Sequence, residues 1–180
     1  MEFEMAKISI KDEVKHDRDV VFSTFRDELT KLLPYLPDVK DIEVKSRDDV
    51  DDKTVKVVNL WKADSDEVPR LAQAFIKPEM LEWIDRATWN EDKWSCDWVM
   101  EVGFLSDAVT CKGTTKYLEK GEGKTEVVIE GELNVDARKI PGVPRLGAGK
   151  IGNVIESFVV RLITPNLTQV NRGLEQYLKS

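Results

Sequence analysis

The stretch KIGNVIESFVVRLITPNLTQVNRGLEQYLK, residues 150–179, decides how the rest of the chain folds. Its apolar residues recur at steps of three and four, which is the period of one face of an α-helix. The members of this stripe are Ile151, Val154, Ile155, Phe158, Leu162, Leu167, Val170, Leu174 and Leu178. A helix of this length runs roughly 45 Å at about 1.5 Å per residue, so it needs an equally long apolar surface to lie on.

The residues upstream supply that surface as a series of strands. Alternation of apolar and polar residues predicts strands over 6–16, 41–47, 54–63, 81–89, 94–102, 108–118 and 125–135. Most of these strands are polar on one face throughout. A sheet of this kind must cover its other face, and the C-terminal helix is the only predicted element long enough to do so.

A shorter helix is predicted over 17–33, with Asp17 as the N-cap and Pro34 as the stop signal. Its end shows a possible break near residues 26–28. Residues 64–78 lose the alternation and fit either a short helix or a packed loop. The element order is then strand, helix, six strands and long helix. It predicts an α+β fold in which a curved antiparallel sheet of six to seven strands wraps around the C-terminal helix, as one domain over 1–180.

Composition argues against several classes of function. The net charge is -7 and the lysines are dispersed among acidic residues, which argues against nucleic-acid binding. Residues 1–5 carry two glutamates and no apolar run, and no apolar stretch is long enough to span a membrane. We therefore expect a cytoplasmic protein without stable membrane insertion. The oligomeric state cannot be inferred from these features.

The residues that commonly bind metals or form disulfides are few. Cys96 and Cys111 lie in a chain without a secretion signal, so free core thiols are a simpler expectation than a disulfide. With His16 as the single histidine, the sequence has no metal-ligand spacing, and no metal or other cofactor is expected. Residues 147–150 lack the spacing of a phosphate-binding loop, and we interpret them as a flexible entry to the long helix.

Three features together resemble the START and Bet v 1-like superfamily, also called SRPBCC proteins. They are the strand and capped helix over 8–33, the meander of strands with Trp89 and Trp94 near its middle, and the closing helix over 149–178. Residues 68–89 and the start of that helix are further similar to an uncharacterised bacterial family within the superfamily. The resemblance covers nearly the whole chain and carries no catalytic motif. It implies the helix-grip fold, with a cavity between sheet and helix that commonly holds lipids, sterols, polyketides or other apolar molecules.

The candidate lining of such a cavity consists of side chains in phase with the inner face of the sheet, together with the helical stripe. The predicted ligand-binding residues are Asn59, Trp61, Trp83, Asp85, Trp98, Met100, Cys111, Thr115, Tyr117, Phe158 and Leu162. Trp89 and Trp94 complete the aromatic part of the predicted lining, and the alternative is that the five tryptophans simply fill the core. Pro165 interrupts the stripe and predicts a bend in the helix, which either opens a portal or lets the helix follow the sheet.

Asp12, His16, Asp85 and Tyr117 are polar residues in phase with the buried face. Burying a carboxylate is costly, so Asp12 and Asp85 must pair, shift their pKa or reach water through a cavity, unless they lie at strand ends that face solvent.

Our leading hypothesis is a non-enzymatic protein that binds or transfers a hydrophobic small molecule, lipid-like or polyketide-like. A cyclase- or hydratase-type enzyme is the alternative, and it requires at least two of these four residues in one cavity. A partner-binding module is a third, which the polar outer strand faces argue against.

Overall fold

The computed structural model describes residues 5–180 except 65–67, 69, 71–72, 75 and 78–80, and describes no side chain at 104, 159 or 161–166. The strands are β1 (Ala6–Val14), β2 (Val39–Asp49), β3 (Thr54–Ala63), β4 (Glu82–Asn90), β5 (Ser95–Glu101), β6 (Val109–Glu119) and β7 (Thr125–Val135). The α-helices are α1 (Arg18–Asp27) and α2 (Ala148–Lys179), and the short 3-10 helices are η1 (Leu29–Tyr35), η3 (Gly103–Leu105) and η4 (Ala137–Lys139).

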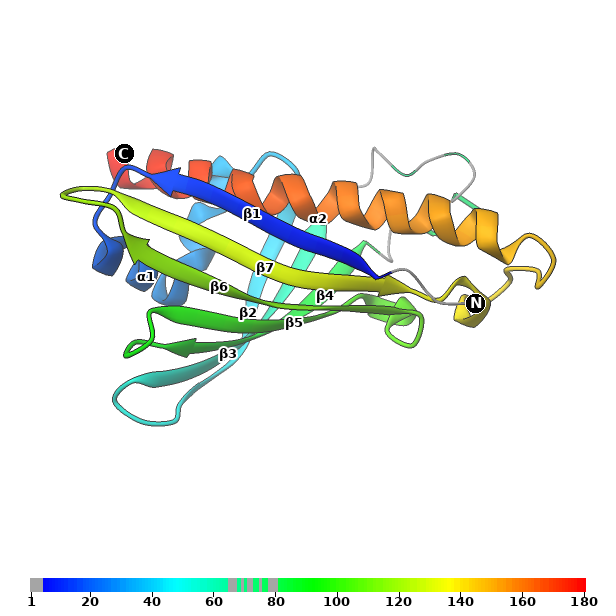
Figure 1. The fold of residues 1–180 in the computed structure, drawn as a ribbon, viewed down its shortest axis with the longest axis horizontal. Coiled ribbons are helices and arrows are strands. Elements are labelled where there is room, and N and C mark those ends of the chain that lie inside the picture. The colour runs from blue at the N-terminus through cyan, green and yellow to red at the C-terminus, as the bar shows by residue number, and fades with distance from the viewer. Residues whose placement is uncertain (1–4, 65–67, 69, 71–72, 75, 78–80) are drawn as a thin grey trace.

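All seven strands form one antiparallel sheet in the order β1-β7-β6-β5-β4-β3-β2. Strands β2 to β7 follow one another as a meander, and β1 pairs with the last of them. The helix α2 runs along the length of the curled sheet, with its C-terminal end near α1 (Figure 1). The predicted fold class is therefore confirmed: it is α+β, with a curved sheet wrapped around a long C-terminal helix.

The hydrophobic core lies between the inner face of the sheet and the helices. Along β3 the alternation is plain, because Val55, Val57, Asn59, Trp61 and Ala63 are all buried while their neighbours are less so. The helix α1 buries Val21, Phe22, Thr24 and Phe25, and α2 buries Ile155, Phe158 and Leu174. Each large apolar side chain buried in this way contributes roughly 1.5–3 kcal/mol.

The first helix is broken where the sequence indicated. α1 ends at Asp27, and the tighter helix η1 continues from Leu29 to Tyr35 with Pro34 near its end. Asp17 occupies the N-cap position of α1, but its side chain does not cap the helix. Its Oδ1 instead accepts a hydrogen bond of 2.8 Å from the backbone N–H of Gly123, which ties the start of α1 to the turn between β6 and β7.

The long helix begins directly after Gly147, whose φ of 92° is a left-handed conformation that glycine adopts without strain. This confirms the interpretation of residues 147–150 as a helix entry. The helix continues through Pro165 as one element, and the portal there stays a prediction. The prediction for 64–78 falls mostly on residues outside those described. In the described part of the chain, no helix is both long and apolar enough to cross a bilayer.

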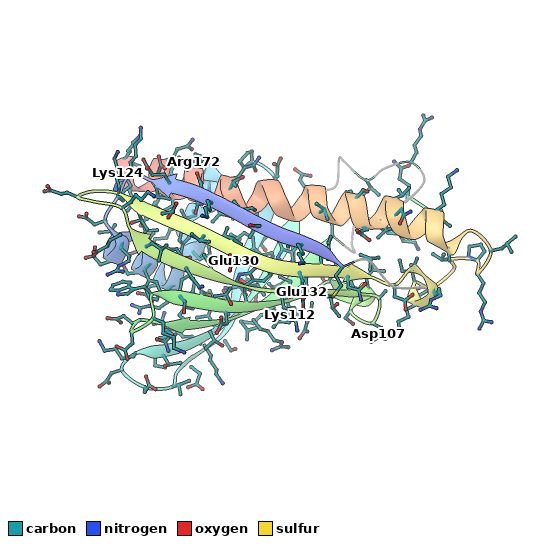
Figure 2. All side chains as sticks on the ribbon, viewed as in Figure 1. Asp107, Lys112, Lys124, Glu130, Glu132 and Arg172 are labelled. Carbon is teal, nitrogen blue, oxygen red and sulfur yellow. The ribbon has the colours of Figure 1, made fainter. Side chains whose placement is uncertain are left out.

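The outer face of the sheet is polar. Lys112 and Glu132, which are partners on β6 and β7, form an ion pair of 3.3 Å, and Glu130 lies near them (Figure 2). Arg86 on β4 pairs with Glu101 on β5 at 2.6 Å. These pairs keep the convex side of the sheet solvated and leave the inner face to form the core.

Candidate functional site

A cavity of about 130 Å³ lies between the inner face of the sheet and the C-terminal half of α2. The side chains on its wall are Phe25, Leu29, Asn59, Trp61, Trp83, Asp85, Ala87, Trp89, Cys96, Trp98, Met100, Thr115, Tyr117, Val127, Ile129, Leu167, Val170 and Asn171. An apolar cavity of about 150 Å³ is large enough to hold benzene. The space here therefore suits a compact, ring-sized molecule better than an extended lipid chain.

Most of the predicted site residues meet in this cavity. Eight of them are on its wall: Asn59, Trp61, Trp83, Asp85, Trp98, Met100, Thr115 and Tyr117. They share the wall because every second residue of β3, β4, β5 and β6 points to the same face of an antiparallel sheet. That they bind a ligand stays a prediction.

Three predicted residues are not placed on the wall. Cys111 on β6 is buried opposite Met100 of β5, and Phe158 is buried on the inner face of α2. Neither is among the lining residues. The side chain of Leu162 lies outside those described. Among its described side chains, the helix contributes Leu167, Val170 and Asn171 to the wall, and Phe158 lies about 14 Å back from Leu167 along the helix axis at about 1.5 Å per residue.

Trp94 also differs from the prediction. It is the last residue of the turn between β4 and β5, with a φ of 49°, and it does not belong to the strand. Its ring packs edge-on against Phe22 at 5.2 Å, and the guanidinium of Arg18 lies 4.3 Å from its centroid. The indole of Trp94 is thus part of the core beside α1 and lies off the cavity wall.

Sequence reasoning missed several residues on the wall. Phe25 and Leu29 come from α1 and η1, and Asn171 comes from α2. Asn171 is four residues after Leu167 and three before Leu174, so its spacing placed it in the apolar stripe of α2. A buried amide within an apolar stripe was the signal that could have identified it.

Two aromatic pairs flank the middle of the cavity. The rings of Trp61 and Trp83, cross-strand partners on β3 and β4, are stacked at 5.8 Å with an interplanar angle of 11°. The rings of Trp89 and Tyr117 are stacked at 5.9 Å with an angle of 25°. Asp85 lies between these pairs on β4, because residues 83, 85, 87 and 89 alternate onto the inner face.

Asp85 is half-buried and lies on the cavity wall. Burial raises the pKa of its carboxyl from 3.8 to about 7, although the neighbouring Asn59 amide and Trp61 indole act in the opposite direction. Its contacts with Asn59 and Trp61 are weak hydrogen bonds, because Oδ1 of Asp85, Oδ1 of Asn59 and Nε1 of Trp61 have no partner at good hydrogen-bond geometry within the described part of the chain. Each such buried atom costs about 1–3 kcal/mol unless water or a ligand pairs with it.

Two further titratable groups share the wall with Asp85. Burial, and to a lesser extent the charge of Asp85, raises the pKa of the Cys96 thiol well above its ordinary value. Burial, followed by the charges of Cys96 and Asp85, raises the pKa of the Tyr117 hydroxyl in the same way. Both groups therefore stay protonated near neutral pH. Cys111, behind the wall, also has its pKa raised, to about 12, mainly by burial. Cys96 lies opposite Thr115 rather than Cys111, and both cysteines are free thiols.

The other two acid-base candidates lie away from the cavity wall. Asp12 on β1 binds Arg172 of α2, with Nη2 at 2.7 Å from both carboxylate oxygens, and accepts a hydrogen bond of 2.9 Å from the Asn171 amide. Burial alone would raise the pKa of Asp12, but the hydrogen bonds from Arg172 and Asn171 outweigh it and lower the pKa. His16 follows β1, and its carbonyl accepts a hydrogen bond of 2.8 Å from the Thr125 hydroxyl. Neither residue lines the cavity.

Arg172 lies beside the end of β1 (Figure 2). Its guanidinium also donates to the backbone carbonyl of Glu13 at 2.7 Å. This link holds the last turns of α2 against the sheet and so fixes Asn171 on the cavity wall. Among the described residues, no group of three or more histidine, cysteine, aspartate or glutamate side chains is arranged to hold a metal ion.

The fold is shared with several solved structures. The chain has the helix-grip fold of Bet v 1-like proteins, as its resemblance predicted. TTHA0849 from Thermus thermophilus is similar over 96% of both chains, with a TM-score of 0.66 and 20% identity. The Zhui aromatase/cyclase from Streptomyces sp. R1128 is similar over 97% of this chain and 96% of that one, with a TM-score of 0.65 and 14% identity.

A more distant solved structure of the same fold is norcoclaurine synthase from Thalictrum flavum in complex with dopamine and hydroxybenzaldehyde. It matches 88% of both chains with a TM-score of 0.52 and 16% identity. No protein-family model matches the sequence, and no curated protein matches it. At these identities the likeness shows the fold, which hosts both ligand binding and catalysis and does not determine the function of this chain.

Proposed function

We propose that this protein binds a compact hydrophobic molecule in the cavity between the sheet and α2. The observation that carries the proposal is the wall itself: Trp61, Trp83, Trp89 and Trp98 line a space of about 130 Å³ with few polar groups. Ligand sites are typically apolar cavities with a small number of polar groups that fix orientation. The binding of two single-ring compounds by norcoclaurine synthase, named with its structure, supports a ligand of this size.

The proposal is tested by filling the cavity. Ala87 is buried on the wall, and its neighbour Thr88 is on the outer face of the same strand. Binding of benzene and phenol to the purified protein is measured by chemical-shift titration of the amide signals. We expect saturable binding by the wild type and by Thr88→Leu, and loss of binding by Ala87→Leu. Absence of saturable binding in the wild type would overturn the proposal.

Extraction of the protein under native purification gives a second measurement. Mass spectrometry of the extract identifies small molecules that the protein retains. A retained apolar molecule is expected in the wild type and not in Ala87→Leu. Whether the protein also transfers its ligand between sites is then measured by the rate at which the retained molecule exchanges.

A cyclase- or hydratase-type activity is the second candidate, and one observation favours it. Asp85 and Tyr117 lie on the same cavity wall, and the pKa of about 7 makes Asp85 available as a base and as an acid near neutrality. Two of the four candidate acid-base residues thus share the cavity, as this hypothesis requires. Asp12 and His16 have no part in it.

This second candidate is tested without knowing the substrate. A carboxylate base in the cavity would remove a proton from the methyl carbon of bound acetophenone and return a deuteron from heavy water. Deuterium incorporation is followed by NMR in the wild type and in Asp85→Asn. Catalysed exchange that the substitution abolishes would support an enzyme, and exchange at the uncatalysed rate in both proteins would count against one.

A further inference from the structure

The cavity wall carries an acidic side chain without a counter-charge. Asp85 is the acid, and no lysine, arginine or histidine of the described part of the chain is among the lining residues. Arg86, the next residue on β4, lies on the outer face of the sheet and pairs there with Glu101. A carboxylate that is partly shielded from water is stabilised by a nearby cation. When Asp85 is ionised, its negative charge is therefore balanced by no described side chain of the wall.

The two carboxyl oxygens of Asp85 differ in their surroundings. Oδ1 is enclosed, and so are Oδ1 of Asn59 and Nε1 of Trp61 beside it, so a ligand in the cavity does not reach these three atoms. Oδ2 is not enclosed in this way, because Asp85 is half-buried on the cavity wall. Within the described residues, no hydrogen bond is made to Oδ2. The accessible acceptor of this carboxyl group is therefore Oδ2.

The hydroxyl of Tyr117 is a second acceptor on the same wall. It has no hydrogen-bond partner among the described residues, and it is not one of the fully enclosed polar atoms. Tyr117 is on β6, and its ring is stacked on Trp89 of β4, so the side chain leans across β5 toward the strand that carries Asp85. The charge of Asp85 contributes to the raised pKa of Tyr117, which agrees with this placement. The two acceptors thus face the same space.

The chemistry of these two oxygens distinguishes between possible polar groups of a ligand. An ammonium group donates up to three hydrogen bonds and carries the positive charge that Asp85 lacks, so it satisfies both acceptors. A neutral hydroxyl has a single donor and brings no charge. A carboxylate or a phosphate would lie against Asp85 with the same sign of charge. Tryptophan and tyrosine rings also attract a cation over their faces, which an aliphatic wall does not.

We propose that the ligand is a small protonated amine with an apolar body of about one ring, whose ammonium group donates to Oδ2 of Asp85 and to the hydroxyl oxygen of Tyr117. This inference rests on the proposed binding function and specifies its ligand class. The apolar body lies against the aromatic side chains of the wall, and the volume of about 130 Å³ limits its size.

Benzylamine and benzyl alcohol form the decisive pair, because they have nearly the same size and differ in the charge of one group. Dissociation constants are measured at about pH 8 by chemical-shift titration of the full-length protein. We expect benzylamine to bind at least about tenfold more tightly, as expected for a hydrogen bond between charged groups. Equal affinities, or tighter binding of benzyl alcohol, would overturn the inference while leaving the binding function in place. Binding of neither compound would overturn the binding function as well.

The pH dependence of binding gives an independent measurement on the unaltered protein. The pKa of Asp85 is about 7 in the ligand-free protein, so its ionised fraction rises about tenfold from about pH 6 to about pH 8. Cys96 on β5 and Cys111 and Tyr117 on β6 have raised pKa values and stay protonated, and the described helical side chains of the wall are uncharged. We expect the affinity for benzylamine to rise about tenfold over this range, and the affinity for benzyl alcohol to stay the same. A benzylamine affinity that falls with rising pH would overturn the inference.

Substitutions assign the effect to particular atoms. Asp85→Asn keeps the shape of the side chain and removes its charge, and we expect it to abolish the preference for benzylamine. Asp97→Asn is the matched control, because it removes the same charge from the outer face of β5, where Asp97 accepts a hydrogen bond of 2.6 Å from the Thr114 hydroxyl. The preference should persist in this control and fall severalfold in Tyr117→Phe. A preference that survives Asp85→Asn would overturn the inference.

Discussion

The indole of Trp98 lies across Gly113, its partner on the neighbouring strand. A Cβ atom added at position 113 would lie 2.5 Å from Cζ2 of Trp98 and 2.4 Å from the backbone oxygen of Glu130. A Cβ atom added at Gly131, the partner of Gly113 on β7, would likewise lie 2.9 Å from Cη2 of Trp98. Two adjacent glycines therefore make room for a tryptophan that forms part of the cavity wall.

We expect Gly113→Ala to destabilise the protein by about 1–3 kcal/mol, because the new methyl group must displace a backbone oxygen and a packed ring. Gly149→Ala is the matched control, since a Cβ there meets nothing within 4 Å and lies in the first turn of α2. The control should be neutral or stabilise by up to about 1 kcal/mol. Urea denaturation measures both variants, and equal stability of the two would contradict the packing described for Trp98.

Asp85 makes stability depend on pH in an unusual direction. Its pKa is about 7 in the folded protein and 3.8 when unperturbed, so between these values the folded state binds more protons than the unfolded state. The free energy of unfolding therefore falls as pH rises from about 4 to about 7, and the contribution is constant above that range. At about 1.4 kcal/mol per pH unit the loss approaches roughly 4 kcal/mol.

Asp85→Asn removes this ionisation and should reduce the fall in stability across that range. The measurement is urea denaturation of both proteins at several pH values. Cys96 and Tyr117, the titratable neighbours on the wall, do not interfere because their pKa values are raised and they stay protonated. Parallel pH profiles for wild type and variant would show that Asp85 ionises in the folded state at its ordinary pKa.

The pairing of Asp12 with Arg172 makes stability depend on pH in the opposite direction to Asp85. The pKa of Asp12 is lowered, so the stability that it contributes is present above pH 3.8 and is lost as pH falls through the lower folded value. We expect Asp12→Asn to cost about 1–2 kcal/mol at pH 7, because the pair is partly shielded from solvent. Glu132→Gln, which breaks the more exposed pair with Lys112, should change stability by less than about 0.5 kcal/mol. Costs of the same size at both sites would argue against a special role for the Asp12 link.

The two cysteines should be inert in the folded protein. Both thiols are buried and have raised pKa values, and the thiolate is the reactive form. With a thiol reagent at pH 8, we expect two thiols to react in urea and negligible reaction in buffer. Rapid reaction of one thiol without denaturant would mean that the cavity, which Cys96 lines, opens to solvent.

Much of the fold was predictable from the sequence because its signals are periodic. The strand over 54–63 and the strand over 125–135 match the structure at both ends, and the break in the first helix was visible near residues 26–28. Alternation in a strand fixes which side chains share the inner face, so Asn59, Trp61 and Asp85 were predicted together. The helical stripe fixed the face of α2 that packs on the sheet, and with it the α+β class.

Tertiary structure decided what periodicity leaves open. The helical periodicity predicts which face of α2 is buried but not where each turn lies along the sheet. It therefore could not predict that Asn171 is on the cavity wall and that Phe158 is not. The pairing of Asp12 with Arg172, 160 residues apart, likewise depends on chain packing. The burial that raises the pKa of Asp85 arises only when side chains from distant segments meet. The same holds for the cavity volume of about 130 Å³, which distinguishes this site from a filled core.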